Sequence, residues 1–180
     1  MTRTRVLYVV ICGAGPAKRI ADCIKLAHAA GWEAHCIATP SAIEYFLDVP
    51  ALESLTGHQV RSTYRAPGDE SFPPADAVAV APATYNTINK WAAGITDTYA
   101  LNMLAELTGL GVPIAVLPFV NTALAANRVF ERSITELREA GIQVLFGEGG
   151  FTPHPPRTGE TILDRYPWPL ALEALAQDQP

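Results

Sequence analysis

Features that mark several common functional classes are scarce in this chain. Cysteine occurs three times in 180 residues, and Cys12, Cys23 and Cys36 all lie in the first fifth of the sequence. An odd number of cysteines without close paired spacing argues against a disulfide framework and against a zinc site. We therefore expect three buried thiols in the core, and the sequence offers no metal-binding motif.

Long apolar runs and blocks of like charge are also missing. The basic N-terminus leads into an apolar stretch from Val6 to Ile11, which is too short to span a membrane and lacks a small-residue cleavage site. The formal net charge is -5 with both signs scattered, so no nucleic-acid-binding stripe and no polybasic membrane patch is present. We expect a cytoplasmic protein whose partner is a small molecule or another subunit.

What the sequence does contain is a series of short apolar runs rich in Val and Ile. Such near-continuous runs are typical of strands that are buried on both faces. They cover Arg5 to Ile11, Ala34 to Ala38, Ala77 to Ala81, Pro113 to Leu117 and Ile142 to Phe146. A further strand is a candidate at Gln59 to Arg65. A chain of this length suits one domain that buries roughly two thirds of its unfolded surface.

Helical patterns alternate with these runs. They extend over Ala17 to Ala30, over Thr87 to Thr108 with a break at Gly94, and over Leu124 to Ala140. Glycines directly after the first and third patterns are typical of helix C-termini. The alternation predicts an α/β fold, a single Rossmann-like doubly wound domain with a parallel sheet, right-handed crossovers and helices on both faces.

Two segments interrupt the alternation. Residues Ala66 to Pro74 are rich in proline and acids and are expected to form a loop. Residues Gly147 to Pro169 are rich in glycine and proline, and we expect an irregular segment that covers the site. A short helix from Pro169 to Ala176 is expected to close a single domain over residues 1–180.

Ligands of an open parallel sheet bind beyond the carboxyl ends of the strands, so the loops at that edge are the candidate site. In the first loop, Gly13 and Gly15 let the backbone around Ala14 approach an anion at the start of a helix. The position of the third glycine of a dinucleotide fingerprint is Lys18. The first loop alone therefore fits an ordinary strand-to-helix turn equally well.

The second loop, Thr39-Pro40-Ser41-Ala42, follows the second strand. A nicotinamide-binding sheet usually carries an acid here, whereas Thr39 and Ser41 offer hydroxyl donors that suit a phosphate monoester. Alternatively, Ser41 caps the following helix, with Glu44 at the spacing of a capping box. The two roles are compatible.

The third loop, Ala81 to Thr87, concentrates small and polar side chains. Pro82 and Ala83 would let a flat ring lie against the backbone, while Thr84, Asn86 and Thr87 can bond to a ring edge. The alternative is a capped helix that begins near Thr87, but a cap needs only one such residue, so we favour a ligand site.

The fourth loop, Leu117 to Thr122, places the polar Asn121 among apolar neighbours. It follows the fourth strand, so it reaches the same edge of the sheet as the other three loops. A ligand contact by Asn121 and an ordinary helix cap at Asn121 or Thr122 explain this loop equally well.

The third loop also carries a family resemblance. APATYNT at Ala81 to Thr87 is similar to the Pro-Ala-Ser-Ala-Asn-Thr motif of the homo-oligomeric flavin-containing cysteine decarboxylase family, and KWAAGITD at Lys90 to Asp97 resembles its continuation. Weaker similarity is found at Thr39 to Ala42 and at Pro118 to Asn121, where Val120 replaces the Met of a Pro-x-Met-Asn motif. The resemblance runs from about residue 6 to residue 144. The family includes lantibiotic peptidyl-cysteine decarboxylases and phosphopantothenoylcysteine decarboxylase.

The resemblance implies an FMN cofactor in a flavoprotein domain. It implies that the phosphate is held by the first two loops and that the isoalloxazine ring lies beside Pro82 to Thr87. It implies a homotrimer, or trimers gathered into a dodecamer, with each flavin at a subunit boundary. If the protein is an oxidative decarboxylase of a small thiol or a peptide terminus, the resemblance implies that Asn86 and Asn121 orient the substrate. The flavin would oxidise the substrate cysteine to a thioaldehyde, which then loses carbon dioxide.

The chain departs from the family at two catalytic positions. The family histidine that precedes the Ala-Asp pair, here Ala75-Asp76, would fall near Gly68, where no histidine is present. His58 lies about ten residues too early, and we interpret it as a histidine of a surface loop in preference to a catalytic base. The cysteine of the flap in phosphopantothenoylcysteine decarboxylases has no counterpart, because no cysteine follows Cys36.

Two other functions stay open. A flavin prenyltransferase-like enzyme would share the fold and use FMN as a substrate, but it needs a basic pocket, for which Lys90, Arg128 and Arg132 are the candidates. A flavin-binding module without decarboxylase activity is favoured by the absent histidine. Asp97 is expected either to cap the second half of the broken helix or to meet a neighbouring subunit.

Overall fold

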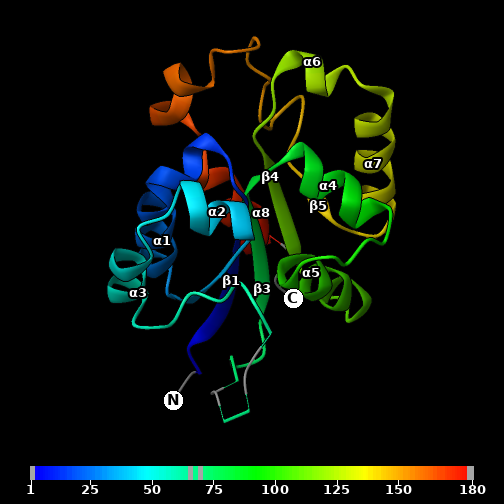
Figure 1. Cartoon of the computed structure of the whole chain (residues 1–180). Coiled ribbons are helices and arrows are strands. Elements are labelled where there is room, and N and C mark those ends of the chain that lie inside the picture. The colour runs from blue at the N-terminus through cyan, green and yellow to red at the C-terminus, as the bar shows by residue number, and fades with distance from the viewer. Residues whose placement is uncertain (1–2, 65–66, 69–70, 178–180) are drawn as a thin grey trace.

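A parallel five-stranded sheet with the order β2-β1-β3-β4-β5 forms the centre of the computed structural model, which describes residues 3–64, 67–68 and 71–177 (Figure 1). Its strands are β1 (Arg5–Ile11), β2 (Trp32–Ala38), β3 (Ala77–Ala83), β4 (Ile114–Pro118) and β5 (Gln143–Val144). The chain runs from β1 outward to β2 and then returns to the other side of β1. The loops after β1 and β3 therefore diverge at a topological switch point.

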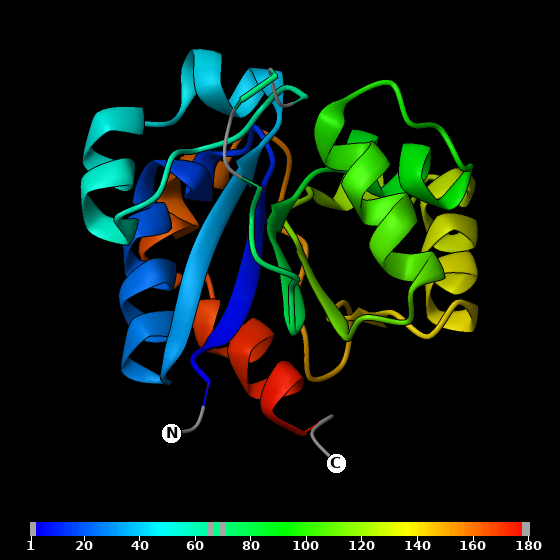
Figure 2. The same cartoon turned by 90° about the horizontal axis from the view of Figure 1, so that it is seen from below.

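Helices cover both faces of the sheet, as Figure 2 shows most clearly. Helices α1 and α8 pack against each other on one face, and α4 packs against α5 and α7 on the other. The helices are η1 (Gly15–Arg19), α1 (Ile20–Ala29), α2 (Pro40–Tyr45), α3 (Val49–Thr56), α4 (Tyr85–Ala92), α5 (Tyr99–Gly109), α6 (Thr122–Ala125), α7 (Arg128–Glu139), η2 (Gly159–Arg165) and α8 (Trp168–Gln177). The predicted doubly wound α/β fold is confirmed.

The core forms where the apolar runs predicted it. Every residue of β3 and β4 is buried, and β1 is buried from Val6 onward, because helices lie above and below the strands. All three cysteines are buried free thiols, as expected. In the part of the chain that the structure describes, no helix combines the length and the apolar character that crossing a membrane requires.

Polar caps divide two of the predicted helices. The pattern from Thr87 to Thr108 becomes α4 and α5, because Gly94 adopts a positive φ of 70° and the Thr98 side chain caps α5. The pattern from Leu124 to Ala140 becomes α6 and α7, because Asn127 accepts a hydrogen bond from the Val129 amide and starts a new helix. The break at Gly94 was predicted and the second break was not.

Two segment predictions were wrong. The proposed strand at Gln59 to Arg65 contributes a single bridge between Arg61 and Ile37, while residue 65 lies outside the described residues. The segment from Gly147 to Pro169 is not irregular throughout, because it contains η2 and the start of α8. The last helix begins at Trp168, one residue before the predicted start.

A buried tyrosine attaches the C-terminal segment to the sheet. The Tyr166 hydroxyl donates a hydrogen bond of 2.6 Å to the Leu117 carbonyl of β4. Burial raises the pKa of Tyr166 well above 10, so the hydroxyl keeps its proton and remains a donor. The ring also contacts Phe119, Phe151 and Trp168 edge-on or tilted. This aromatic group fixes the segment over the end of β4.

We predict that Tyr166→Phe destabilises the protein. Removing the hydroxyl leaves the buried Leu117 carbonyl without this donor, which should lower the free energy of unfolding by about 1–2 kcal/mol and lower Tm by roughly 2–8 °C. Thermal unfolding followed by circular dichroism measures the change. Tyr45→Phe is the control, because Tyr45 is 67% exposed and should leave Tm unchanged. Equal Tm values for the two variants would refute this role.

Candidate functional site

A cavity of about 340 Å³ lies at the carboxyl edge of the sheet, where the loops after β1, β2 and β3 meet. Six of the expected cofactor residues line it, together with one further residue of the second loop and two residues that the sequence did not predict. The expected residues are Gly13, Thr39, Ser41, Thr84, Asn86 and Thr87, the further loop residue is Pro40, and the unpredicted ones are Thr98 and Leu101. The predicted loops therefore do converge on one place.

The first and second loops are in direct contact. A Cβ atom built on Gly13 would lie 2.4 Å from Ser41 Oγ and 3.0 Å from the Ser41 carbonyl carbon. Only a residue without a side chain allows this approach. Because Gly13 has no Cβ, the Ser41 hydroxyl at the start of α2 can lie against the backbone of the first loop.

The hydroxyls of the second loop are not used as helix caps. Thr39, not Ser41, is the N-cap residue of α2, and its side chain makes no capping hydrogen bond. The alternative interpretation, in which Ser41 caps this helix with Glu44, does not hold, because Ser41 lies inside the first turn. Thr39 Oγ1 and Ser41 Oγ lie 3.3 Å apart and form a pair of hydroxyls beside the cavity.

The third loop combines a helix cap with a cavity wall. Thr84 accepts a hydrogen bond from the Thr87 amide (3.2 Å) and donates to Thr87 Oγ1 (3.0 Å), so α4 begins at Tyr85, two residues earlier than the alternative reading placed it. Asn86 in the first turn is exposed at the cavity. Thr84 alone supplies the cap of α4, so the other polar side chains of this turn are not needed to start the helix.

The remaining expected cofactor residues lie behind the cavity wall. Pro82 and Ala83 are buried members of β3, and Ala14 is 9% exposed at the start of η1. They are not among the residues that line the cavity. The Cys12 amide donates to the Pro82 carbonyl (3.1 Å), so these positions connect the first loop to the third.

The Cys12 thiol lies beneath the third loop and stays protonated. Burial raises its pKa, and hydrogen bonds with Thr87 and Thr84 oppose the rise without cancelling it. A protonated thiol is a poor nucleophile. Cys12 therefore supports the turn and is not a reactive group of the site.

Asn121 is not brought into the cavity. Its Oδ1 accepts a hydrogen bond of 3.0 Å from the Leu124 amide and caps α6, and it forms a bridge with His154 of the C-terminal segment. Figure 1 shows this segment beside α6. The sequence left two explanations of Asn121 open, and the helix cap, one of the two, is present. The side-chain amide nitrogen of Asn121 takes no part in this cap.

The lining of the cavity is neutral. Among the described residues, none that lines it is an acid or a base. Nearby cations are paired elsewhere: Lys18 with Glu160 (3.3 Å) and Lys90 with Asp97.

The proposed capping role of Asp97 was wrong, because Thr98 caps α5. Thr98 itself had a sequence signal, since a threonine directly before a helical pattern is a common N-cap.

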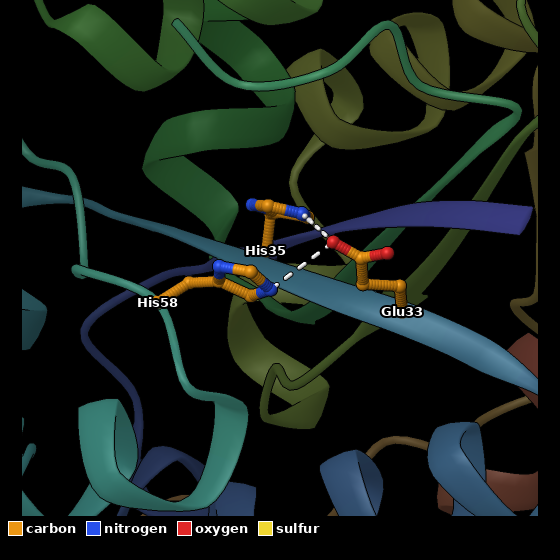
Figure 3. Close-up of side chains that lie close together, drawn as sticks. All are labelled: Glu33, His35 and His58. Carbon is orange, nitrogen blue, oxygen red and sulfur yellow. Dashed lines mark hydrogen bonds and ion pairs between the residues drawn. The ribbon is translucent and has the colours of Figure 1, made fainter. Parts of the chain in front are cut away.

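His58 does not border this cavity. It lies beyond α3, where its ring stacks on that of His35 with 3.9 Å between the ring centroids and its Nε2 lies 3.1 Å from Glu33 (Figure 3). The interpretation as a loop histidine is consistent with its side chain being 33% exposed. The geometry gives no support to a role as the catalytic base of the flavin site.

The family model described as Flavoprotein matches residues 1–164, which is most of the chain. The chain belongs to the Flavoprotein family. The membership confirms the predicted recognition, which rested mainly on the residues from Ala81 to Asp97.

One curated protein is similar in sequence, and solved structures share the fold. The coenzyme A biosynthesis bifunctional protein CoaBC of Thermococcus kodakarensis is 28% identical over 142 residues, which cover 71% of this chain and 34% of that protein. The chain thus spans about a third of that relative. The FMN-dependent cysteine decarboxylase TvaF from thioviridamide biosynthesis is 25% identical with a TM-score of 0.71, covering 97% of this chain and 99% of TvaF. AnUbiX in complex with FMN and dimethylallyl pyrophosphate is 18% identical with a TM-score of 0.72, covering 97% and 93%.

The donor set of the cavity fits the phosphate monoester and the ring edge of a flavin nucleotide. A phosphate needs hydrogen-bond donors, and the cavity offers the Thr39 and Ser41 hydroxyls next to the Gly13 backbone. Acids would repel it, and none of the described lining residues is one. The amide of Asn86 and the hydroxyls of Thr87 and Thr98 can bond to a polar ring.

Proposed function

We propose that the protein binds FMN in the cavity between the loops after β1, β2 and β3. The observation that carries this proposal is the convergence of a glycine cradle and two hydroxyls that cap no helix, Gly13 with Thr39 and Ser41, in a cavity without charged lining residues among those described. Family membership supports the cofactor class. Hydroxyl and backbone donors suit the phosphate, so we assign this group to Gly13, Thr39 and Ser41, with Ala14 supporting the first loop from behind the cavity wall.

The isoalloxazine ring is assigned to the third loop. Thr84, Asn86 and Thr87 line the cavity on the side of α4, and Thr98 and Leu101 extend this wall onto α5. Pro82 and Ala83 support the wall from within β3. A flat ring here would meet an amide and hydroxyls at its polar edge and Leu101 on an apolar side.

We further propose that the protein is an FMN-dependent decarboxylase of a small thiol or of a cysteine at a peptide terminus. Bound FMN supplies a two-electron acceptor for such a substrate. The chain's own contribution is to bind and orient: Asn86, exposed at the cavity, is the residue placed to hold the substrate beside the ring. Asn121, which caps α6 outside the cavity, is assigned a substrate contact through its side-chain amide nitrogen, which the cap does not use.

A homo-oligomer, either a trimer or trimers gathered into a dodecamer, is part of this proposal, as the resemblance to the cysteine decarboxylases implies. A cytoplasmic location is part of it as well. Three free, buried cysteines are typical of proteins from reducing compartments.

The structure gives less support to a prenyltransferase-like function. Such an enzyme needs cations for a prenyl phosphate in addition to the flavin phosphate. Lys90 is paired with Asp97, and Arg132 lies at a separate hollow between α4 and α7 that also contains Glu136. We therefore favour the decarboxylase.

Ser41→Ala should weaken FMN binding. The variant removes one hydroxyl donor to a charged phosphate, which should raise the Kd for FMN about 10- to 100-fold. Titration of the flavin-free protein, followed by quenching of FMN fluorescence, measures the Kd. Ser54→Ala on the exposed side of α3 is the matched control and should bind as the wild type does. An unchanged Kd for Ser41→Ala would place the phosphate elsewhere.

Asn86→Ala should separate flavin binding from turnover. We expect FMN to stay bound through its phosphate contacts and the remaining ring contacts, but kcat/KM to fall by roughly 10- to 100-fold, because the substrate is no longer oriented. Peptides with a C-terminal cysteine are the substrates, and mass spectrometry detects the loss of carbon dioxide and two hydrogens. Asn102→Ala on α5 is the control. Full activity of Asn86→Ala would refute its role, and an inactive wild type with bound FMN would favour a flavin-binding module.

A further inference from the structure

A second cavity, of about 510 Å³, lies away from the flavin cavity and shares no lining residue with it. It is bounded by β2, by the loop after α3 and by residues 71–73. Three side chains of different elements converge there: Glu33 and His35 from β2 and His58 from the loop (Figure 3). Glu33 and His35 share a face of the sheet because they are two residues apart on one strand.

The three side chains direct one potential ligand atom each toward a common point. Glu33 Oε1 lies 3.0 Å from His35 Nε2 and 3.1 Å from His58 Nε2, and all three atoms lie within 4.8 Å of one another. Two imidazole nitrogens and one carboxylate oxygen form a donor set found in open zinc sites and in other sites of borderline divalent metals. None of these residues is needed by the proposed FMN site.

We propose that Glu33, His35 and His58 form a site for a borderline divalent cation such as Zn²⁺. His35 is the fixed ligand, because its side chain is 3% exposed in the middle of β2. His58 is the adjustable ligand on the loop. Three protein donors leave at least one coordination position, which faces the cavity and is open to water or to a small ligand.

Closing the site takes a small rearrangement. A cation bonded to both nitrogens at about 2.0–2.1 Å requires them to lie within about 4.2 Å of each other. The two rings are now stacked at an interplanar angle of 21°, so their in-plane lone pairs lie in two separate, nearly parallel planes. A rotation of the partly exposed His58 ring is needed to direct its Nε2 lone pair at the cation. The cation replaces the two Nε2 protons that now lie toward Glu33.

Two features limit the affinity to a moderate value. After metal binding, His35 carries its proton on Nδ1, which is buried and has no hydrogen-bond partner among the described residues. Ligating histidines normally donate this proton to an acceptor, and losing that partner costs roughly 10- to 100-fold in affinity. The guanidinium of Arg61, over the ring of Phe72, also lines the cavity and repels a cation. We therefore expect a Kd for Zn²⁺ in the micromolar range.

The cation would connect the edge strand of the sheet to the loop after α3. The loop is already joined to β2 by the bridge between Arg61 and Ile37 and by the contacts of His58 with Glu33 and His35. Bonds from His58 and from β2 to one cation would strengthen this connection, so metal binding should also order the loop.

The test is a calorimetric titration of untagged, chelator-treated full-length protein with Zn²⁺, repeated with Co²⁺ to record its visible absorption. We expect one equivalent per chain with a micromolar Kd and Co²⁺ bands typical of nitrogen and oxygen ligands. His58→Gln and Glu33→Gln should each weaken Zn²⁺ binding at least tenfold. His28→Gln is the matched control, because His28 is exposed on α1, and it should bind like the wild type.

Two results would overturn the site: a wild type that binds no Zn²⁺ below millimolar concentrations, or a Kd that neither His58→Gln nor Glu33→Gln changes. Circular dichroism shows whether each variant is folded. The FMN content of the same samples distinguishes failure of this proposal from failure of the flavin assignment, because the two cavities share no residue.

Discussion

The contact between the Gly13 backbone and the Ser41 side chain constrains the whole carboxyl edge of the sheet. A Cβ at residue 13 would overlap Ser41 Oγ, so the loop after β1 and the helix after β2 can lie this close only with glycine at that position. The central place of β1, between β2 and β3, then brings the loop after β3 to the same point, and the bond from the Cys12 amide to the Pro82 carbonyl holds it there. The neutral, hydroxyl-rich cavity follows from these contacts, and the proposed flavin site depends on them.

The fold could be predicted because burial on both faces leaves a strong sequence signal. Runs such as Val6 to Ile11 and Ala77 to Val80 have no polar face, and strands of this kind belong to parallel sheets covered by helices. Details that depend on a single side chain were missed. Asn127 divides one helical pattern by capping α7, and the apolar contacts of Tyr166 order a segment whose glycines and prolines predicted irregular structure.

The candidate site was predictable as a group of loops and less so residue by residue. Thr39, Ser41 and Asn86 reach the cavity because they follow the carboxyl ends of β2 and β3, the two strands that flank β1. Pro82 is buried in β3 and does not line the cavity. The sequence could not show this, because a strand buried on both faces has no alternation of polar and apolar residues. The cluster of Glu33, His35 and His58 had no signal, because a loop and an edge strand that are 23 residues apart meet only in the folded chain.

The visible absorption spectrum of the purified protein, with mass identification of any chromophore released on denaturation, tests the central claim most directly. A flavin cavity predicts a yellow protein that releases FMN at about one molecule per chain. A colourless protein that also fails to take up added FMN would contradict the account. In that case the hydroxyls and amides at the carboxyl edge would serve helix starts alone.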